Sequence, residues 1–81
     1  MKIYVENISS EVTELEIKNL FSKFGFVELI HISKYFDKYG AMAIIEMPED
    51  KKALEAIEKL NGTKLSGRQI TVYSSVMEGV E

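Results

Sequence analysis

The sequence predicts an α+β domain whose elements follow in the order β-α-β-β-α-β. Apolar and polar residues alternate in four short segments, at residues 2–6, 27–33, 40–47 and 70–73, and such alternation is typical of strands that bury one face. Apolar residues follow a helical spacing in two longer segments, one after the first strand and one after the third. Turn-forming residues separate the segments and define the order of the elements.

The first strand and the first helix are predicted from residues 2 to 24. Ile3 and Val5 lie on one face of the strand. Thr13 and Glu16 have the spacing of a capping box, so the helix is expected to begin after Thr13. The helix then carries apolar residues at positions i, i+3, i+4 and i+7, namely Ile17, Leu20, Phe21 and Phe24. Gly25 is in the usual C-cap place, and we expect the helix to stop there.

Alternation assigns a face to each residue of the second and third strands. The inward residues are expected to be Ile30, Ile32, Ala41, Ala43, Ile45 and Met47. The outward residues are expected to be Leu29, His31, Ser33, Gly40, Met42, Ile44 and Glu46. A loop rich in basic and aromatic residues, at 34–39, joins the two strands.

The second helix and the last strand complete the pattern. Pro48 suits the start of a helix, and an apolar stripe follows at Ala53, Ala56, Ile57 and Leu60. Asn61 and Gly62 end this helix, and Ser66 and Gly67 form a later turn. In the last strand, Ile70 and Val72 alternate with the outward residues Thr71 and Tyr73.

This order of elements is that of a ferredoxin-like sandwich, in which two helices pack on one face of a four-stranded antiparallel sheet. The other face of the sheet is then free. Right-handed crossovers place the first and third strands side by side in the middle of the sheet. Tyr4, Met42 and Ile44 are therefore expected at the centre of the free face.

Length and composition bound the domain. A chain of 81 residues makes one domain, which we assign to residues 1–75, with a C-terminal tail at 76–81. The absence of cysteine excludes disulfides and thiolate metal sites and suits a reducing cytosol. No apolar run approaches the roughly 20 residues of a membrane-spanning helix, and the first residues lack the pattern of a signal peptide. We therefore expect a cytoplasmic protein without a membrane contact.

Catalytic patterns are absent from the sequence. It has no pairing of a nucleophile with a base, no Gly-rich phosphate loop and no cluster of His or carboxylates with catalytic spacing. His31 is the single histidine and cannot form a metal site of recognised spacing. We therefore expect a binding protein that is not an enzyme and that uses neither a metal nor a cofactor.

Ile-Tyr-Val-Glu-Asn-Ile at residues 3–8 and Gly-Ala-Met-Ala-Ile-Ile-Glu-Met at residues 40–47 stand on two of the predicted strands. Together they resemble the two ribonucleoprotein consensus segments of the RNA recognition motif family. Residues 3–8, Ile-Tyr-Val-Glu-Asn-Ile, match the first segment at every position. Residues 40–47 match the second segment in their buried half, while its leading basic residue falls on Gly40 and its two stacking aromatic residues fall on Met42 and Ile44. The resemblance extends from Lys2 to about Tyr73, and the chain looks like the small single-domain members of this family from bacteria. It implies a nucleic-acid-binding protein that holds single-stranded RNA on its sheet.

The resemblance and the predicted free face together define candidate RNA contacts. Tyr4, Met42 and Ile44 would form the platform on which bases lie, with His31, Thr71 and Tyr73 around it. Lys2 and Arg68 would contact phosphates near the face. The loop between the second and third strands would add Lys34, Lys38 and Tyr39. Because Met42 and Ile44 stack less well than aromatic residues, binding is expected to be weak or of low specificity.

Two other uses of the free face remain open. Ten Lys and Arg residues against thirteen Asp and Glu residues leave a net charge of -3, which disfavours strong non-specific binding of nucleic acid. A face with aliphatic residues in an acidic domain could instead bind a protein partner or a second copy of the chain. Alternatively, Val76 and Met77 of the tail could fold over the face and cover it.

Overall fold

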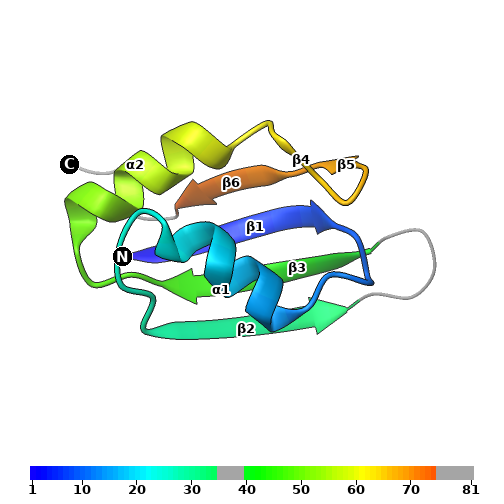
Figure 1. The fold of residues 1–81 in the computed structure, drawn as a ribbon, viewed down its shortest axis with the longest axis horizontal. Coiled ribbons are helices and arrows are strands. Elements are labelled where there is room, and N and C mark those ends of the chain that lie inside the picture. The colour runs from blue at the N-terminus through cyan, green and yellow to red at the C-terminus, as the bar shows by residue number, and fades with distance from the viewer. Residues whose placement is uncertain (35–39, 75–81) are drawn as a thin grey trace.

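Four strands form an antiparallel sheet, and two helices cover one face of it (Figure 1). In this computed structural model, which describes residues 1–34 and 40–74, the strand order is β2-β3-β1-β6. The strands of this sheet are β1 (Lys2–Ile8), β2 (Leu29–Lys34), β3 (Ala41–Glu46) and β6 (Thr71–Ser74). The helices are α1 (Glu14–Ser22) and α2 (Asp50–Leu60). The predicted ferredoxin-like fold is confirmed, and β1 and β3 lie in the middle as expected.

The core lies between the helices and one face of the sheet. Ile3 and Val5 of β1 and Ile45 of β3 are all 0% exposed, and so are Ile17 and Phe21 of α1. The helix α2 adds its own buried stripe, which consists of Ala53, Ala56 and Leu60. Because the buried strand residues all belong to one face, both helices must cover that face. The opposite face carries none of the core residues.

The start of α1 agrees with the sequence prediction, whereas its end does not. The Thr13 amide donates to Glu16 Oε1 at 2.8 Å, and the Glu16 amide donates to Thr13 Oγ1 at 3.2 Å, which together form the capping box. The helix ends at Ser22 and not beside Gly25, because the Phe24 amide donates to the Phe21 carbonyl at 2.9 Å and tightens the last turn.

Gly25 instead allows α2 to pack closely. A Cβ atom on Gly25 would lie 2.9 Å from Cδ and 3.0 Å from Cβ of Lys52 in α2. The glycine therefore serves a contact between elements, and its expected role as the C-cap was wrong. Such a contact cannot be inferred from local spacing.

A short hairpin precedes the last strand of the sheet. It consists of β4 (Lys64–Leu65) and β5 (Arg68–Gln69). Ser66 and Gly67 lie between them with φ angles of 50° and 85°, and positive φ at both central residues is typical of a type I′ turn. The expected turn is present, and the pairing of the two-residue strands around it is an addition to the predicted order.

No helix in residues 1–34 and 40–74 is long and apolar enough to cross a membrane. The predicted tail at 76–81, including Val76 and Met77, lies outside the described residues, as do Lys38 and Tyr39. The proposed cover of the sheet by the tail therefore stays a prediction.

Candidate nucleic-acid interface

The face of the sheet opposite the helices is the candidate site, and we call it the open face. Its residues alternate with the buried ones along each strand, and most of them are half-buried or exposed. The open face consists of Lys2, Tyr4 and Glu6 of β1, Leu29, His31 and Ser33 of β2, Met42, Ile44 and Glu46 of β3, and Thr71 and Tyr73 of β6.

One row of side chains crosses the open face through all four strands. The backbone register pairs His31 with Ile44, Ile44 with Tyr4, and Tyr4 with Tyr73. Directly opposed residues of neighbouring strands have Cβ atoms about 4.5–5.5 Å apart. The row is therefore a continuous strip of side chains. It has a tyrosine on each of β1 and β6, an isoleucine on β3 and a histidine on β2.

The two tyrosines of this row stack on each other. Their ring centroids are 5.4 Å apart, and the ring planes differ by 23°. The Tyr73 hydroxyl donates a hydrogen bond to Glu6 Oε2 at 2.6 Å, which orients the second ring. Tyr73 nevertheless stays 37% exposed. The stacked pair is thus an ordered aromatic surface that solvent can reach.

Charges on the open face have mixed sign. Glu6 and Glu46 are both on this face, and Lys2 is opposite Glu46 in the pairing of β1 with β3. Glu6 already accepts the hydrogen bond from Tyr73. Carboxylates repel phosphates, so a nucleic acid on this face must place its backbone away from the two glutamates. Lys34 is the exposed last residue of β2, and its pairing with the buried Ala41 puts it on the side of the sheet that the helices cover.

Gly40 immediately precedes β3, and its conformation differs from the expectation. It was predicted to be an outward residue of the third strand, but it precedes β3, is buried, and has a φ of 75°. A Cβ atom there would lie 2.4 Å from the Ile8 carbonyl oxygen and 2.7 Å from Arg68 Nη1. A side chain at residue 40 would therefore clash, and the prediction was wrong because it assumed an extended backbone at this residue.

The second consensus segment has a basic residue at the position of Gly40, and in this chain Arg68 of β5 lies beside that position. Its guanidinium Cζ is 3.3 Å from the position that a Cβ of Gly40 would take. The hairpin that carries Arg68 is held to β1 by a hydrogen bond of 2.8 Å from Asn7 Nδ2 to the Gln69 carbonyl. Asn7 has a φ of 66°, a conformation that asparagine tolerates better than most residues. The sequence alone could not have shown that a cation from β5 reaches this corner.

The structure brings most of the predicted contact residues together. Seven of them share the open face, and these are Lys2, Tyr4, His31, Met42, Ile44, Thr71 and Tyr73. Arg68 lies at the corner beside Gly40, whereas Lys34 ends β2 on the side of the sheet that the helices cover. In the part of the chain that the structure describes, no three His, Cys, Asp or Glu side chains are grouped as metal ligands.

Comparisons with known proteins agree with this geometry. Residues 3–71 match the sequence pattern of the RNA recognition motif. The chain is 35% identical over 74 residues to RbpF of Nostoc sp., whose name describes it as a putative RNA-binding protein; the match covers 89% of this chain and 70% of RbpF. It is 34% identical to RbpD of the same organism, with 89% of this chain and 79% of RbpD covered.

A solved structure of the Rna15 domain with bound RNA is also similar. It superposes with a TM-score of 0.77 at 26% identity, and the match covers 95% of this chain and 85% of the Rna15 chain. The chain described here belongs to the RNA recognition motif family.

Proposed function

We propose that this protein binds single-stranded RNA on the open face, with the stacked pair Tyr4 and Tyr73 as its main platform. Family membership and the RNA-binding relatives support RNA as the ligand. The observation that supports this particular face is the exposed row of His31, Ile44, Tyr4 and Tyr73 across the four strands. No chemical step is assigned, because binding domains of this kind act by recognition. An RNA ligand also fits the predicted cytoplasmic location.

Stacking should provide most of the affinity. A base stacked on an aromatic ring contributes about 1–3 kcal/mol and does so for any base. The tyrosine pair is already ordered by its own stacking and by the hydrogen bond to Glu6, so little side-chain entropy is lost when RNA binds. Met42 and Ile44 extend the apolar surface but offer no π face. Moderate affinity with little base preference follows.

Phosphate contacts should be few. The candidate cations in the described residues are Lys2 on the open face, Arg68 beside Gly40 and Lys34 at the end of β2. Three phosphate contacts to single-stranded RNA correspond to a slope of about −2 for the logarithm of the binding constant against the logarithm of the salt concentration. A strongly basic domain would give a much steeper slope.

Fluorescence anisotropy with short labelled RNA strands would test the proposal. Wild type should bind with the shallow salt dependence given above. Replacing both tyrosines, as Tyr4→Leu with Tyr73→Leu, should remove most of the binding. Leu54→Ala is a matched control, because Leu54 is 54% exposed on α2, away from the sheet. Equal affinities of the double variant and the control would refute the platform.

The same face could bind a protein partner instead of RNA, since Leu29, which pairs with Glu46 and is diagonal to Ile44, is 57% exposed. That alternative predicts that RNA does not bind even at low salt. If RNA binds with the same affinity before and after the tyrosines are replaced, the result would also favour a protein partner on the open face. The anisotropy experiment therefore separates the two functions.

A further inference from the structure

The two outer edges of the sheet differ in whether their backbone groups have hydrogen-bond partners. On β6, the Val72 amide donates to Asn61 Oδ1 at 2.9 Å, so the side chain that follows α2 caps this edge. Next to β6, Ile70 exchanges backbone hydrogen bonds of 2.9 Å with Gly62 and Thr63. On β2, by contrast, the strand pairs with β3 alone, and no residue within 1–34 or 40–74 bonds to its outer edge.

The edge of β2 also lacks the usual protection against pairing. Natural edge strands are blocked by proline, by bulges or by charged side chains in the strand. The register of β2 with β3 runs without a shift from Leu29 to Lys34, and the only charged residue is Lys34 at its end. Its backbone donors and acceptors therefore form a regular template for another strand.

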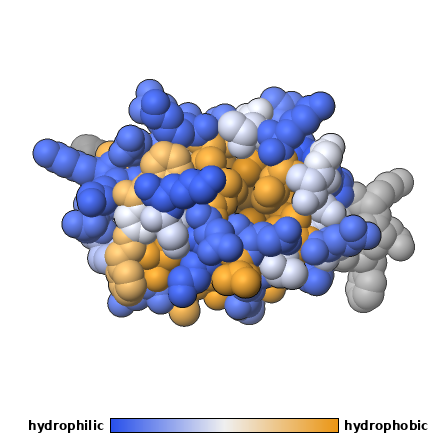
Figure 2. All heavy atoms as spheres, viewed as in Figure 1, coloured by the Kyte–Doolittle hydropathy of each residue, from blue (hydrophilic) through white to orange (hydrophobic). Residues whose placement is uncertain are grey.

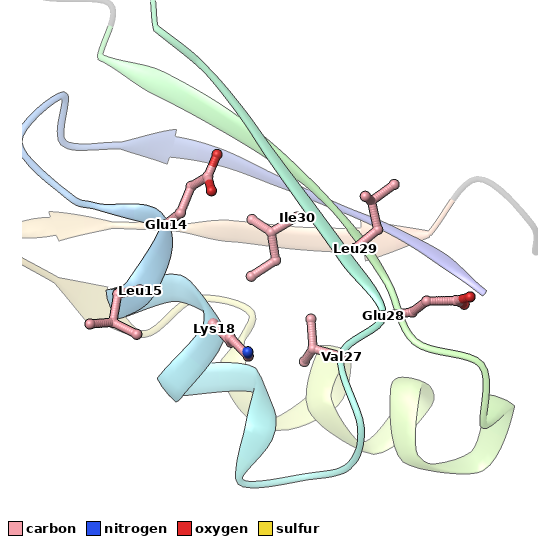
Figure 3. Close-up of a pocket in the computed structure, with 7 residues that line it drawn as sticks. All are labelled: Glu14, Leu15, Lys18, Val27, Glu28, Leu29 and Ile30. Carbon is pink, nitrogen blue, oxygen red and sulfur yellow. The ribbon is translucent and has the colours of Figure 1, made fainter.

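A groove between α1 and β2 lies next to this edge. It has a volume of about 390 Å³. Its lining consists of Glu14, Leu15 and Lys18 of α1 together with Val27, Glu28, Leu29 and Ile30 (Figure 3). Leu15 is 65% exposed, and Phe26, just before the groove, is 67% exposed. Figure 2 shows apolar surface at the lower left, near the start of β2. An added strand would thus find apolar contacts as well as hydrogen-bond partners.

The charges at the ends of the strand complement each other under a two-fold axis. If two copies of β2 pair antiparallel about His31, Glu28 of each copy lies opposite Lys34 of the other. Within the same register, Ile30 lies opposite Ile32. Because of the two-fold symmetry, the pair of Glu28 and Lys34 occurs twice, once at each end of the paired strands. An unrelated peptide would carry charges at both matching positions only by chance. The charge pattern therefore fits a second copy of this chain.

We propose that this protein forms a homodimer through the outer edge of β2, with one sheet continuous through both copies. The open faces of the two copies then lie on the same side of the joint sheet. Two RNA platforms could engage one strand of RNA, so that the second contact benefits from a raised effective concentration. A strand pair and its flanking groove bury less than the roughly 1,200–2,000 Å² of a stable interface, so association should be weak.

Sedimentation equilibrium without RNA, from micromolar to millimolar concentration at low salt, would test the dimer. Lys34→Glu places two carboxylates opposite each other at both ends of the strand pair, and the dimer should weaken about ten-fold. Adding Glu28→Lys to that variant restores opposite charges and should restore the dimer. Lys51→Glu makes the same change of net charge on exposed α2 and should leave the dimer intact.

Three results would overturn the proposal: a monomeric wild type at millimolar concentration, equal effects of Lys34→Glu and Lys51→Glu, or failure of the charge exchange to restore association. If Lys34→Glu does not fold, amide shifts of wild type on dilution provide the second readout. Shifts in residues 29–34 support the edge contact. Shifts confined to Tyr4, Met42 and Ile44 would instead assign the association to the open face. RNA binding by a monomeric protein would leave the proposed function standing while this inference fails.

Discussion

The two faces of the sheet are formed by the same strands but differ in how deeply their side chains are buried. On the covered face, Val5 and Ala43, which are paired across β1 and β3, are both 0% exposed and belong to the same core cluster as the buried helix residues. On the open face, Tyr4 and Ile44 are paired in the same two strands and are only partly buried. Close packing in the core restricts Val5 and Ala43 to apolar residues of a given size. Core packing does not restrict Tyr4 and Ile44 in this way, so the residue types there can suit a ligand. Substitutions should therefore change stability on one face and affinity on the other.

The largest expected effect is a loss of stability on the covered side. Phe21 is 0% exposed in the core, and Phe21→Ala should cost about 3–5 kcal/mol in the free energy of unfolding. Urea denaturation of wild type and variant would measure it. Leu15→Ala on the same helix is the control, because Leu15 is 65% exposed and its truncation should cost less than about 1 kcal/mol. A similar loss in both variants would contradict the position of the core.

The next effect is a gain of affinity on the open face. Met42→Tyr with Ile44→Phe adds two π surfaces next to Tyr4, each worth about 1–3 kcal/mol per stacked base. The affinity for short RNA should rise at least about thirty-fold. Placing the same kind of side chain at Leu54 on α2, as Leu54→Tyr, should have no effect. A folded double variant that binds no better than wild type would contradict the use of this face.

A smaller loss of affinity is expected at the centre of the existing platform. Tyr4→Leu should cost about 1–3 kcal/mol in the free energy of RNA binding and should change stability little, since the ring points away from the core. Tyr73→Phe keeps a ring but loses the hydrogen bond to Glu6 and should cost less. Titration calorimetry with a short RNA would rank the two. A Tyr73→Phe effect larger than that of Tyr4→Leu would mean that Glu6, and not stacking, organises the site.

The smallest effect concerns the cation at the margin of the open face. Arg68→Gln should weaken RNA binding only a few-fold and should make the salt slope shallower by about 0.7, the value for one phosphate contact. Lys64→Gln in the same hairpin is the matched control. If binding becomes weaker but its salt dependence does not change, Arg68 does not contact phosphate. Its role would then be to stabilise the hairpin and the backbone around Gly40.

The covered face could be predicted from the sequence because alternation and helical spacing record burial directly. The buried residues Ile3, Val5, Ile45, Ile17 and Phe21 were all expected in the core, and the capping box marked the start of α1 correctly. These signals are local, so they do not depend on knowing which elements meet. The order of the strands then followed from general rules of connection.

Most of the features that sequence reasoning missed depend on contacts between distant segments. Gly25 was taken as the C-cap of α1, but the helix ends earlier in a tight local turn and Gly25 instead makes room for Lys52 of α2. Gly40 was expected on an extended strand, although the Ile8 carbonyl and Arg68 leave no room for a side chain there. The open face was expected to carry Tyr4 and Tyr73, but nothing in their spacing showed that they stack. Side-chain geometry of this kind requires the folded chain.

Backbone amide shifts during a titration with short single-stranded RNA would show directly whether RNA binds the open face. The experiment uses labelled wild-type protein at low salt, and it reports on every described strand and helix at once. We expect shifts in β1, β3 and β6 around Tyr4, Ile44 and Tyr73, and no change along α2. An absence of shifts up to millimolar RNA, or shifts concentrated on the helices, would contradict RNA binding on the open face.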